Sequence, residues 1–132
     1  MLCTTFFVAD HAELADGKLF VNGGWRDSLE LAQLPQLWPV SLVAVLEVLR
    51  SELETVLPVS ITMVNPAGEE QHVASLDISG PDEPADGSPL RVMETVQVVV
   101  TFNEVGTTTF RLLHDGAELS RATLAVRLAP GP

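Results

Sequence analysis

Apolar and polar side chains alternate along much of the chain with a period of two residues. Between residues 95 and 102 every second position is apolar (Val96, Val98, Val100 and Phe102). Successive side chains of a strand point to opposite faces of a sheet, so this pattern predicts a half-buried strand.

The two segments that follow are predicted to pair as a β-hairpin. Residues 107–114 and 118–128 alternate in the same way and flank Asp115-Gly116. An Asp-Gly pair between alternating runs indicates a tight hairpin, because both turn residues need positive φ. The side chains expected to face inward are Phe110, Leu112, Ala122, Leu124, Val126 and Leu128.

Short strands are also predicted in the first two thirds of the chain. Residues 2–9 and 18–21 could pair across the turn at Asp16-Gly17, and residues 56–64 and 73–78 form two further alternating runs. Strands this short, separated regularly by Gly, Pro, Asn and Asp, are typical of an antiparallel sandwich. We therefore expect an all-β fold, an immunoglobulin-like β-sandwich of about 7–9 strands in a single domain over residues 1–132.

The segment around residues 41–54 allows two interpretations. Leu42, Leu46, Leu49 and Leu53 have helical spacing, which predicts a short helix. Residues 42–49 equally suit a strand that is buried on both faces.

Several motifs resemble the opening of a bacterial family of domains of unknown function. They are Val8-Ala9-Asp10-His11-Ala12-Glu13, Gly17-Lys18-Leu19 and Asn22-Gly23-Gly24. The resemblance implies a small β-sandwich in which residues 42–49 are a strand, and it implies no catalytic residue, cofactor or partner. Thr108 departs from such sandwiches, whose closing strand often carries Tyr or Phe at this place.

The charge of the chain limits its partners. Eighteen Asp and Glu residues outnumber seven Lys and Arg residues, for a net charge of −11. Nucleic acids and anionic membranes are bound through clustered basic side chains, so we expect neither as a partner. Residues 80–89 contain three prolines and several acidic residues and are expected to form a mobile acidic loop.

Cys3 is the only cysteine, so an internal disulfide is excluded and the cytoplasm is the expected location. The apolar residues 1–9 lack a basic start and are expected to form a strand instead of a leader, and no later apolar run is long enough to span a membrane.

The residues suited to acid–base chemistry do not form a recognisable catalytic set. Asp10 and His11 are neighbours and would point to opposite faces of a strand, with Glu13 close by in sequence. Cys3 lies in an apolar run and has no base near it in sequence. We therefore predict no catalytic residue and expect the protein not to be an enzyme.

Metal and cofactor sites are not predicted either. His11, His72 and His114 occur singly. Gly23-Gly24 lacks the following Lys of a phosphate-binding loop. The acidic residues around the loop match no calcium-binding spacing and are better explained as a solvated surface: Asp77, Asp82, Glu83 and Asp86.

The candidate interaction surface consists of Trp25, Trp38, Leu34 and Leu37, which lie in or beside a leucine-rich stretch. The two indoles could cover the core, or they could form an exposed patch for a partner. The apolar fraction of 46% is high for a small domain and favours a covered interface.

Three functions follow from these observations. The first is a non-catalytic protein-interaction or scaffold module of the bacterial cytoplasm, whose partner is another protein or a second copy of the chain. The alternative is a β-sandwich that binds a small ligand, carbohydrate or calcium, through Trp25, Trp38 and the acidic loop. The third, a small hydrolase, would require the fold to bring Cys3 or a serine to His11.

Overall fold

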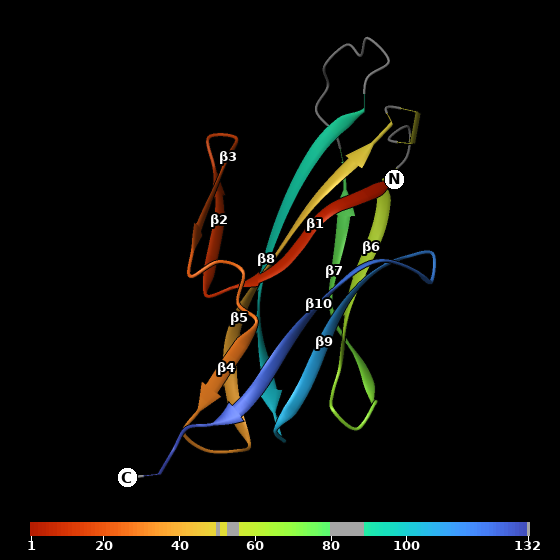
Figure 1. Ribbon diagram of the computed structural model, residues 1–132. Coiled ribbons are helices and arrows are strands. Elements are labelled where there is room, and N and C mark those ends of the chain that lie inside the picture. The colour runs from red at the N-terminus through yellow and green to blue at the C-terminus, as the bar shows by residue number, and fades with distance from the viewer. Residues whose placement is uncertain (50, 53–55, 80–88, 132) are drawn as a thin grey trace.

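A computed structural model describes residues 1–49, 51–52, 56–79 and 89–131, and it confirms an all-β fold (Figure 1). The strands formed by these residues are β1 (Leu2–Ala9), β2 (His11–Ala15), β3 (Lys18–Asn22), β4 (Ser28–Leu31), β5 (Gln36–Val48), β6 (Leu57–Val64), β7 (Glu70–Ile78), β8 (Leu90–Phe102), β9 (Gly106–His114) and β10 (Ala117–Leu128). No helix among the described residues is long and apolar enough to cross a membrane.

Two sheets face each other around one hydrophobic core (Figure 1). The first has the order β1-β5-β8, and the second has the order β4-β10-β9-β6-β7. Neighbouring strands are antiparallel except for β4 and β10, which are parallel. The largest fully buried side chains come from both sheets and include Leu42, Leu46, Ile61, Phe110, Leu112 and Leu124.

Residues 41–48 belong to strand β5, so the strand interpretation is confirmed over these positions and the alternative of a short helix is wrong there. Leu42, Ala44, Leu46 and Val48 face the core, and Val43 on the opposite side is also fully buried. A strand that is buried on both faces lacks alternating polar positions. The spacing of its leucines is then compatible with a helix as well as with a strand. Residues 50 and 53–55 lie outside the described part of the chain.

The predicted pairing of residues 2–9 with residues 18–21 is also wrong. Asp16 and Gly17 do form a two-residue turn with φ values of 53° and 71°. Such a turn pairs the residues directly beside it, Ala15 with Lys18, so β3 pairs with β2. Strand β1 is left to pair with β5.

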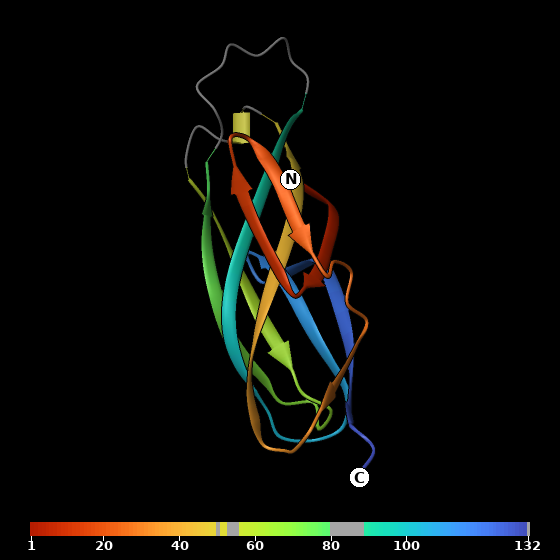
Figure 2. The ribbon, with the colours of Figure 1, turned by 90° about the vertical axis from the view of Figure 1, so that its left-hand side faces the viewer.

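The β2–β3 hairpin lies against the outer face of the three-stranded sheet, as Figures 1 and 2 together show. Its Ala12 and Leu19 pack against Phe7, Ala9 and Val43 and form a second, smaller hydrophobic cluster. The part of the three-stranded sheet around Phe7, Ala9 and Val43 is therefore covered by apolar groups on both faces.

The C-terminal hairpin is confirmed. Asp115 and Gly116 connect β9 to β10 with φ values of 50° and 78°. Phe110 and Leu112 are fully buried as predicted, but Leu128 is 51% exposed. Leu128 is the last residue of β10.

Candidate functional site

Trp25 is the most exposed large aromatic side chain in the described part of the chain, with 68% of its surface accessible. Its ring stacks on Phe7 at a centroid distance of 4.7 Å and an interplanar angle of 8°. Its φ of 60° is unfavourable for a bulky residue. One face of the indole is thus fixed against the protein, and the other is presented to solvent.

The backbone around Trp25 is held by Arg26 and Asp10. The Arg26 amide donates to the Val8 carbonyl at 2.7 Å, and the Arg26 Nη1 lies 3.2 Å and 3.3 Å from the two carboxylate oxygens of Asp10. Its Nε and Nη2 donate to the Ser28 carbonyl at 3.1 Å and 3.0 Å. We call these contacts the Arg26 latch.

Two glycines allow the loop to approach β1 and the hairpin closely. Gly23 has a φ of 60°, and a Cβ there would collide with the Asp10 carboxylate. A Cβ on Gly24 would lie 2.6 Å from Cγ1 of Val21. Residues of the Asn22-Gly23-Gly24 motif therefore serve the geometry of the Trp25 loop.

The β2–β3 hairpin also carries exposed apolar side chains, of which Val21 adjoins the Trp25 loop at Gly24. Leu14, Phe20 and Val21 are 40%, 51% and 39% exposed. Leu14 and Val21 lie on the side of the hairpin that carries Ala12 and Leu19, whereas Phe20 lies on the opposite side. We refer to Leu14, Val21 and Trp25 as the Trp25 face.

The structure does not bring the four residues of the predicted interaction surface together. Trp38 is in β5 and packs partly buried against the main core, and so does Leu34. Leu37 is 65% exposed and lies on the opposite side of β5 from Trp38. Of the two indoles, Trp38 covers the core and Trp25 is exposed.

Asp10 and His11 contribute to different contacts. Asp10 forms the ion pair with Arg26, while His11 Nε2 lies 3.9 Å from a Glu13 carboxylate oxygen on the exposed hairpin. Cys3 packs against the main core, and its thiol donates to the Thr5 carbonyl at 3.3 Å. Burial raises the pKa of the Cys3 thiol above its ordinary value.

The other two histidines make local hydrogen bonds. His72 Nε2 lies 3.0 Å from the Ser75 hydroxyl, and His114 Nδ1 lies 2.9 Å from the Pro58 carbonyl oxygen. Within the described ranges no three His, Cys, Asp or Glu side chains form a group that could hold a metal. Asp82, Glu83 and Asp86 lie outside the described residues.

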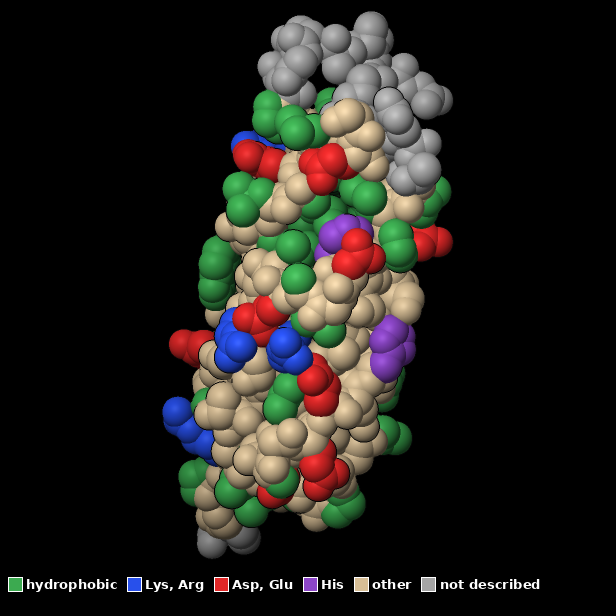
Figure 3. Space-filling view, turned by 90° about the vertical axis from the view of Figure 1, so that its right-hand side faces the viewer, with side chains coloured by type: hydrophobic (Ala, Val, Ile, Leu, Met, Phe, Trp, Pro, Cys, Tyr) green, Lys and Arg blue, Asp and Glu red, His purple; other side chains and the backbone are tan. Residues whose placement is uncertain are grey.

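The outer face of the five-stranded sheet carries a network of charged side chains (Figure 3). Arg111 lies 2.6 Å from a Glu70 carboxylate oxygen and 2.8 Å from one of Glu118, and Arg121 lies 2.9 Å from Glu118. Hydrogen bonds from Thr62 and Arg111 lower the pKa of Glu70, and those from Arg121 and Arg111 lower the pKa of Glu118.

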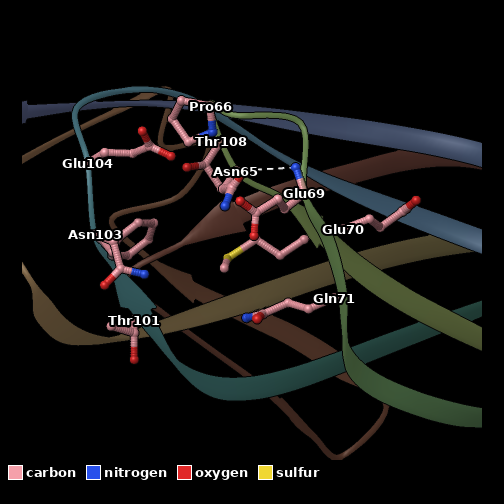
Figure 4. Close-up of a pocket in the computed structure, with 11 residues that line it drawn as sticks. Asn65, Pro66, Glu69, Glu70, Gln71, Thr101, Asn103, Glu104 and Thr108 are labelled. Atoms are coloured by element: carbon pink, nitrogen blue, oxygen red, sulfur yellow. Dashed lines mark hydrogen bonds between the residues drawn. The ribbon is translucent and has the colours of Figure 1, made fainter.

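A pocket of about 220 Å³ opens between the two sheets, where the β6–β7 and β8–β9 turns meet (Figure 4). Its lining is mostly polar: Met63, Asn65, Pro66, Glu69, Glu70, Gln71, Thr101, Phe102, Asn103, Glu104 and Thr108. The sequence marks both turns, through Asn65-Pro66-Ala67-Gly68 and Asn103 to Gly106, but it does not show that they adjoin.

These features define an all-β domain with a buried core, an exposed aromatic face and a separate polar pocket. Residues 4–127 match a family described as a family of unknown function, DUF6941, and the chain belongs to this family. The predicted membership in a family of unknown function is thereby confirmed.

Comparison with curated proteins finds no match. Among solved structures, the chain is similar to a Pseudomonas fluorescens alkylpurine DNA glycosylase, AlkC, bound to DNA containing an abasic site analog, with 12% identity and a TM-score of 0.43. The match covers 92% of this chain and 30% of the glycosylase chain.

Proposed function

We propose that this domain is a non-catalytic protein-interaction module and that the Trp25 face is its binding surface. The observation that carries the proposal is an indole that is 68% exposed yet held by stacking and by the Arg26 latch. A rigid exposed tryptophan loses little conformational entropy on binding and is a common anchor of protein interfaces. A backbone outlier at an exposed aromatic residue also supports a functional role for it.

The charge of the chain favours a different protein as partner over a second copy. Two copies that each carry a net charge of −11 repel each other, whereas a basic protein would be attracted. Glu13 and Asp27 provide negative charge close in sequence to residues of the Trp25 face, whereas the charge of Asp10 is balanced by Arg26. We therefore propose a partner with an apolar anchor surrounded by basic side chains, and the bacterial cytoplasm as the setting.

An immunoglobulin-like topology is part of the same proposal. It is supported by the two facing sheets and by the predominance of antiparallel pairs (Figure 1). In such folds the loops and the outer sheet faces are the usual sites of binding.

The test compares three purified proteins: the wild type, Trp25→Ala and Leu128→Ala. Leu128 is 51% exposed at the end of β10 and serves as a matched apolar control. Each is immobilised and incubated with lysate of the native host at low and high salt, and captured proteins are quantified by mass spectrometry. Their oligomeric state is measured by sedimentation.

We expect a basic protein to be retained by the wild type and by Leu128→Ala, to be lost with Trp25→Ala, and to bind less at high salt. Equal capture by all three proteins would refute the role of the Trp25 face. A wild-type dimer that Trp25→Ala dissociates would replace the proposed partner with a second copy.

A further inference from the structure

We propose that the polar pocket between the β6–β7 and β8–β9 turns binds a small organic cation of the amine or guanidine class. The pocket lies between the ends of the two sheets, and its lining comes from β6, β7, β8, β9 and both turns. Its volume of about 220 Å³ is below the range of drug-sized sites, so the ligand is small.

The charge of the lining selects a cation. Glu69 and Glu104 contribute carboxylates, and no Lys, Arg or His side chain lines the pocket within the described residues. Figure 4 shows Glu104 pointing toward the space between the turns, while Glu70 points away from it, toward its partner Arg111. An anion would meet only like charge here, whereas a cation gains charge-assisted hydrogen bonds.

Thr108 provides an independent indication of a ligand. Its side chain lines the pocket, the residue is only 2% exposed, and within the described ranges its hydroxyl has no hydrogen-bond partner. The hydroxyl is not one of the fully shielded atoms without a partner, which are those of Gln36 and Ser41 among the described residues, so it is accessible from the pocket. A hydroxyl can both donate and accept a hydrogen bond, and a molecule in the pocket can pair with it. The amides of Gln71 and Asn103 also point toward the pocket (Figure 4).

The backbone of the β6–β7 turn, which carries Asn65 and Glu69, is also held in place before any ligand binds. The Asn65 side-chain oxygen accepts from the Glu69 amide at 2.9 Å, and the Asn65 amide donates to the Glu69 carbonyl at 2.9 Å. A Cβ on Gly106, whose φ is 129°, would lie 3.0 Å from Cβ of Pro66, so the two turns touch. Preorganisation of this kind lowers the entropic cost of binding.

The small size of Thr108 keeps the pocket open. An aromatic side chain at this buried position would extend into the space that the turns enclose, since it is far larger than a threonine side chain. Thr108→Phe is therefore a filling variant, and Thr108→Val removes only the hydroxyl at nearly constant volume.

The experiment is calorimetric titration of the full chain with putrescine and agmatine, with 1,4-butanediol as the neutral analogue of putrescine. The proteins are the wild type, Thr108→Val, Thr108→Phe, Glu104→Gln and Glu13→Gln. Glu13 is exposed on the hairpin and controls for the loss of one negative charge. Circular dichroism checks that each variant is folded.

We expect both amines, and not 1,4-butanediol, to bind the wild type and Glu13→Gln. Glu104→Gln should weaken binding about tenfold, Thr108→Val several-fold, and Thr108→Phe should abolish it. The proposal is overturned if neither amine binds, if 1,4-butanediol binds as well as putrescine, or if Glu104→Gln and Thr108→Val both bind like the wild type. None of these results bears on the Trp25 face, because the pocket and that face share no residue.

Discussion

The outer face of the five-stranded sheet is polar and carries the ion pairs of Arg111, whereas the outer face of the three-stranded sheet is apolar around Phe7 and Val43. The first face meets water directly (Figure 3). The second is covered by the β2–β3 hairpin (Figure 2). The two sheets share one core, but the outer face of one is charged and solvated, whereas that of the other is apolar and packs against the hairpin.

The difference shows why apolar side chains of the hairpin stay exposed. A two-stranded hairpin is narrower than the sheet it covers, so the apolar side chains at its margin stay accessible, among them Leu14 and Val21. The charged outer face of the five-stranded sheet needs no covering element, because its side chains form hydrogen bonds and ion pairs with water and with one another. The hairpin thus creates both a second core and an exposed face.

The largest expected effect tests whether the hairpin cluster is a true core. Phe7→Ala removes a ring that is 7% exposed and supports Trp25, so we expect a loss of about 3 kcal/mol in the free energy of unfolding. Urea denaturation measures it. Thr123→Ala, on the outer face of the other sheet, should stay within about 0.5 kcal/mol of the wild type. If the two variants lose equal stability, the contrast between the faces fails.

The next effect concerns the Arg26 latch. Arg26→Ala removes two hydrogen bonds to the Ser28 carbonyl and the ion pair with Asp10, for an expected loss of about 1 kcal/mol. Trp25 should become more mobile, which lowers its steady-state fluorescence anisotropy. Arg121→Ala, on the opposite face, should leave that anisotropy unchanged. An unchanged anisotropy in Arg26→Ala would show that stacking on Phe7 alone holds the indole.

Local patterns predicted the strands that are buried on one face. Alternation located β8 and β9, and Asp115-Gly116 fixed the hairpin between β9 and β10. The same reasoning left β5 open between a strand and a helix, because burial of Val43 beneath the hairpin removes the polar positions that mark a strand. Pairing of β1 was mispredicted because the alternation of residues 2–9 does not reveal which strand lies beside them.

The candidate sites were predictable only in part. Trp25 was identified from its residue type, but its support by Phe7 and Arg26 depends on contacts between β1 and the loop after β3. The polar pocket was missed because it joins two turns about forty positions apart in sequence. Sequence shows the turn residues, and only the packing of the sheets shows that the turns meet.

A smaller effect concerns the pH dependence of the polar face. The pKa of Glu118 is lowered in the folded state from 4.5, so its ion pairs stabilise the protein above that pH and are lost as the pH falls through the folded pKa. Glu118→Gln should lower the urea midpoint at pH 7, less so at high salt, and should leave it unchanged at strongly acidic pH. A loss that persists at acidic pH would show that the carboxylate charge is not its cause.

The smallest effect has the opposite sign and lies at Glu94. This residue is in β8, an edge strand, and pairs with Ala44 on the side that faces the core. Burial raises the pKa of Glu94 from 4.5, so the charged form costs stability, and stability is lost as the pH rises through the folded pKa. Glu94→Gln should therefore raise the urea midpoint at pH 7 and have little effect below pH 4.5.

The retention of a destabilising carboxylate at this position is explained by the free edge of β8. An inward-pointing charge on an edge strand discourages pairing with the edge of another molecule. We expect Glu94→Gln to be more stable as a monomer but to associate more readily in sedimentation experiments at pH 7, whereas Glu30→Gln, on the exposed side of β4, should change neither property. If Glu94→Gln is more stable and remains monomeric, the carboxylate of Glu94 does not prevent association through the edge of β8. The contrast between the two sheets is then limited to how their outer faces are covered.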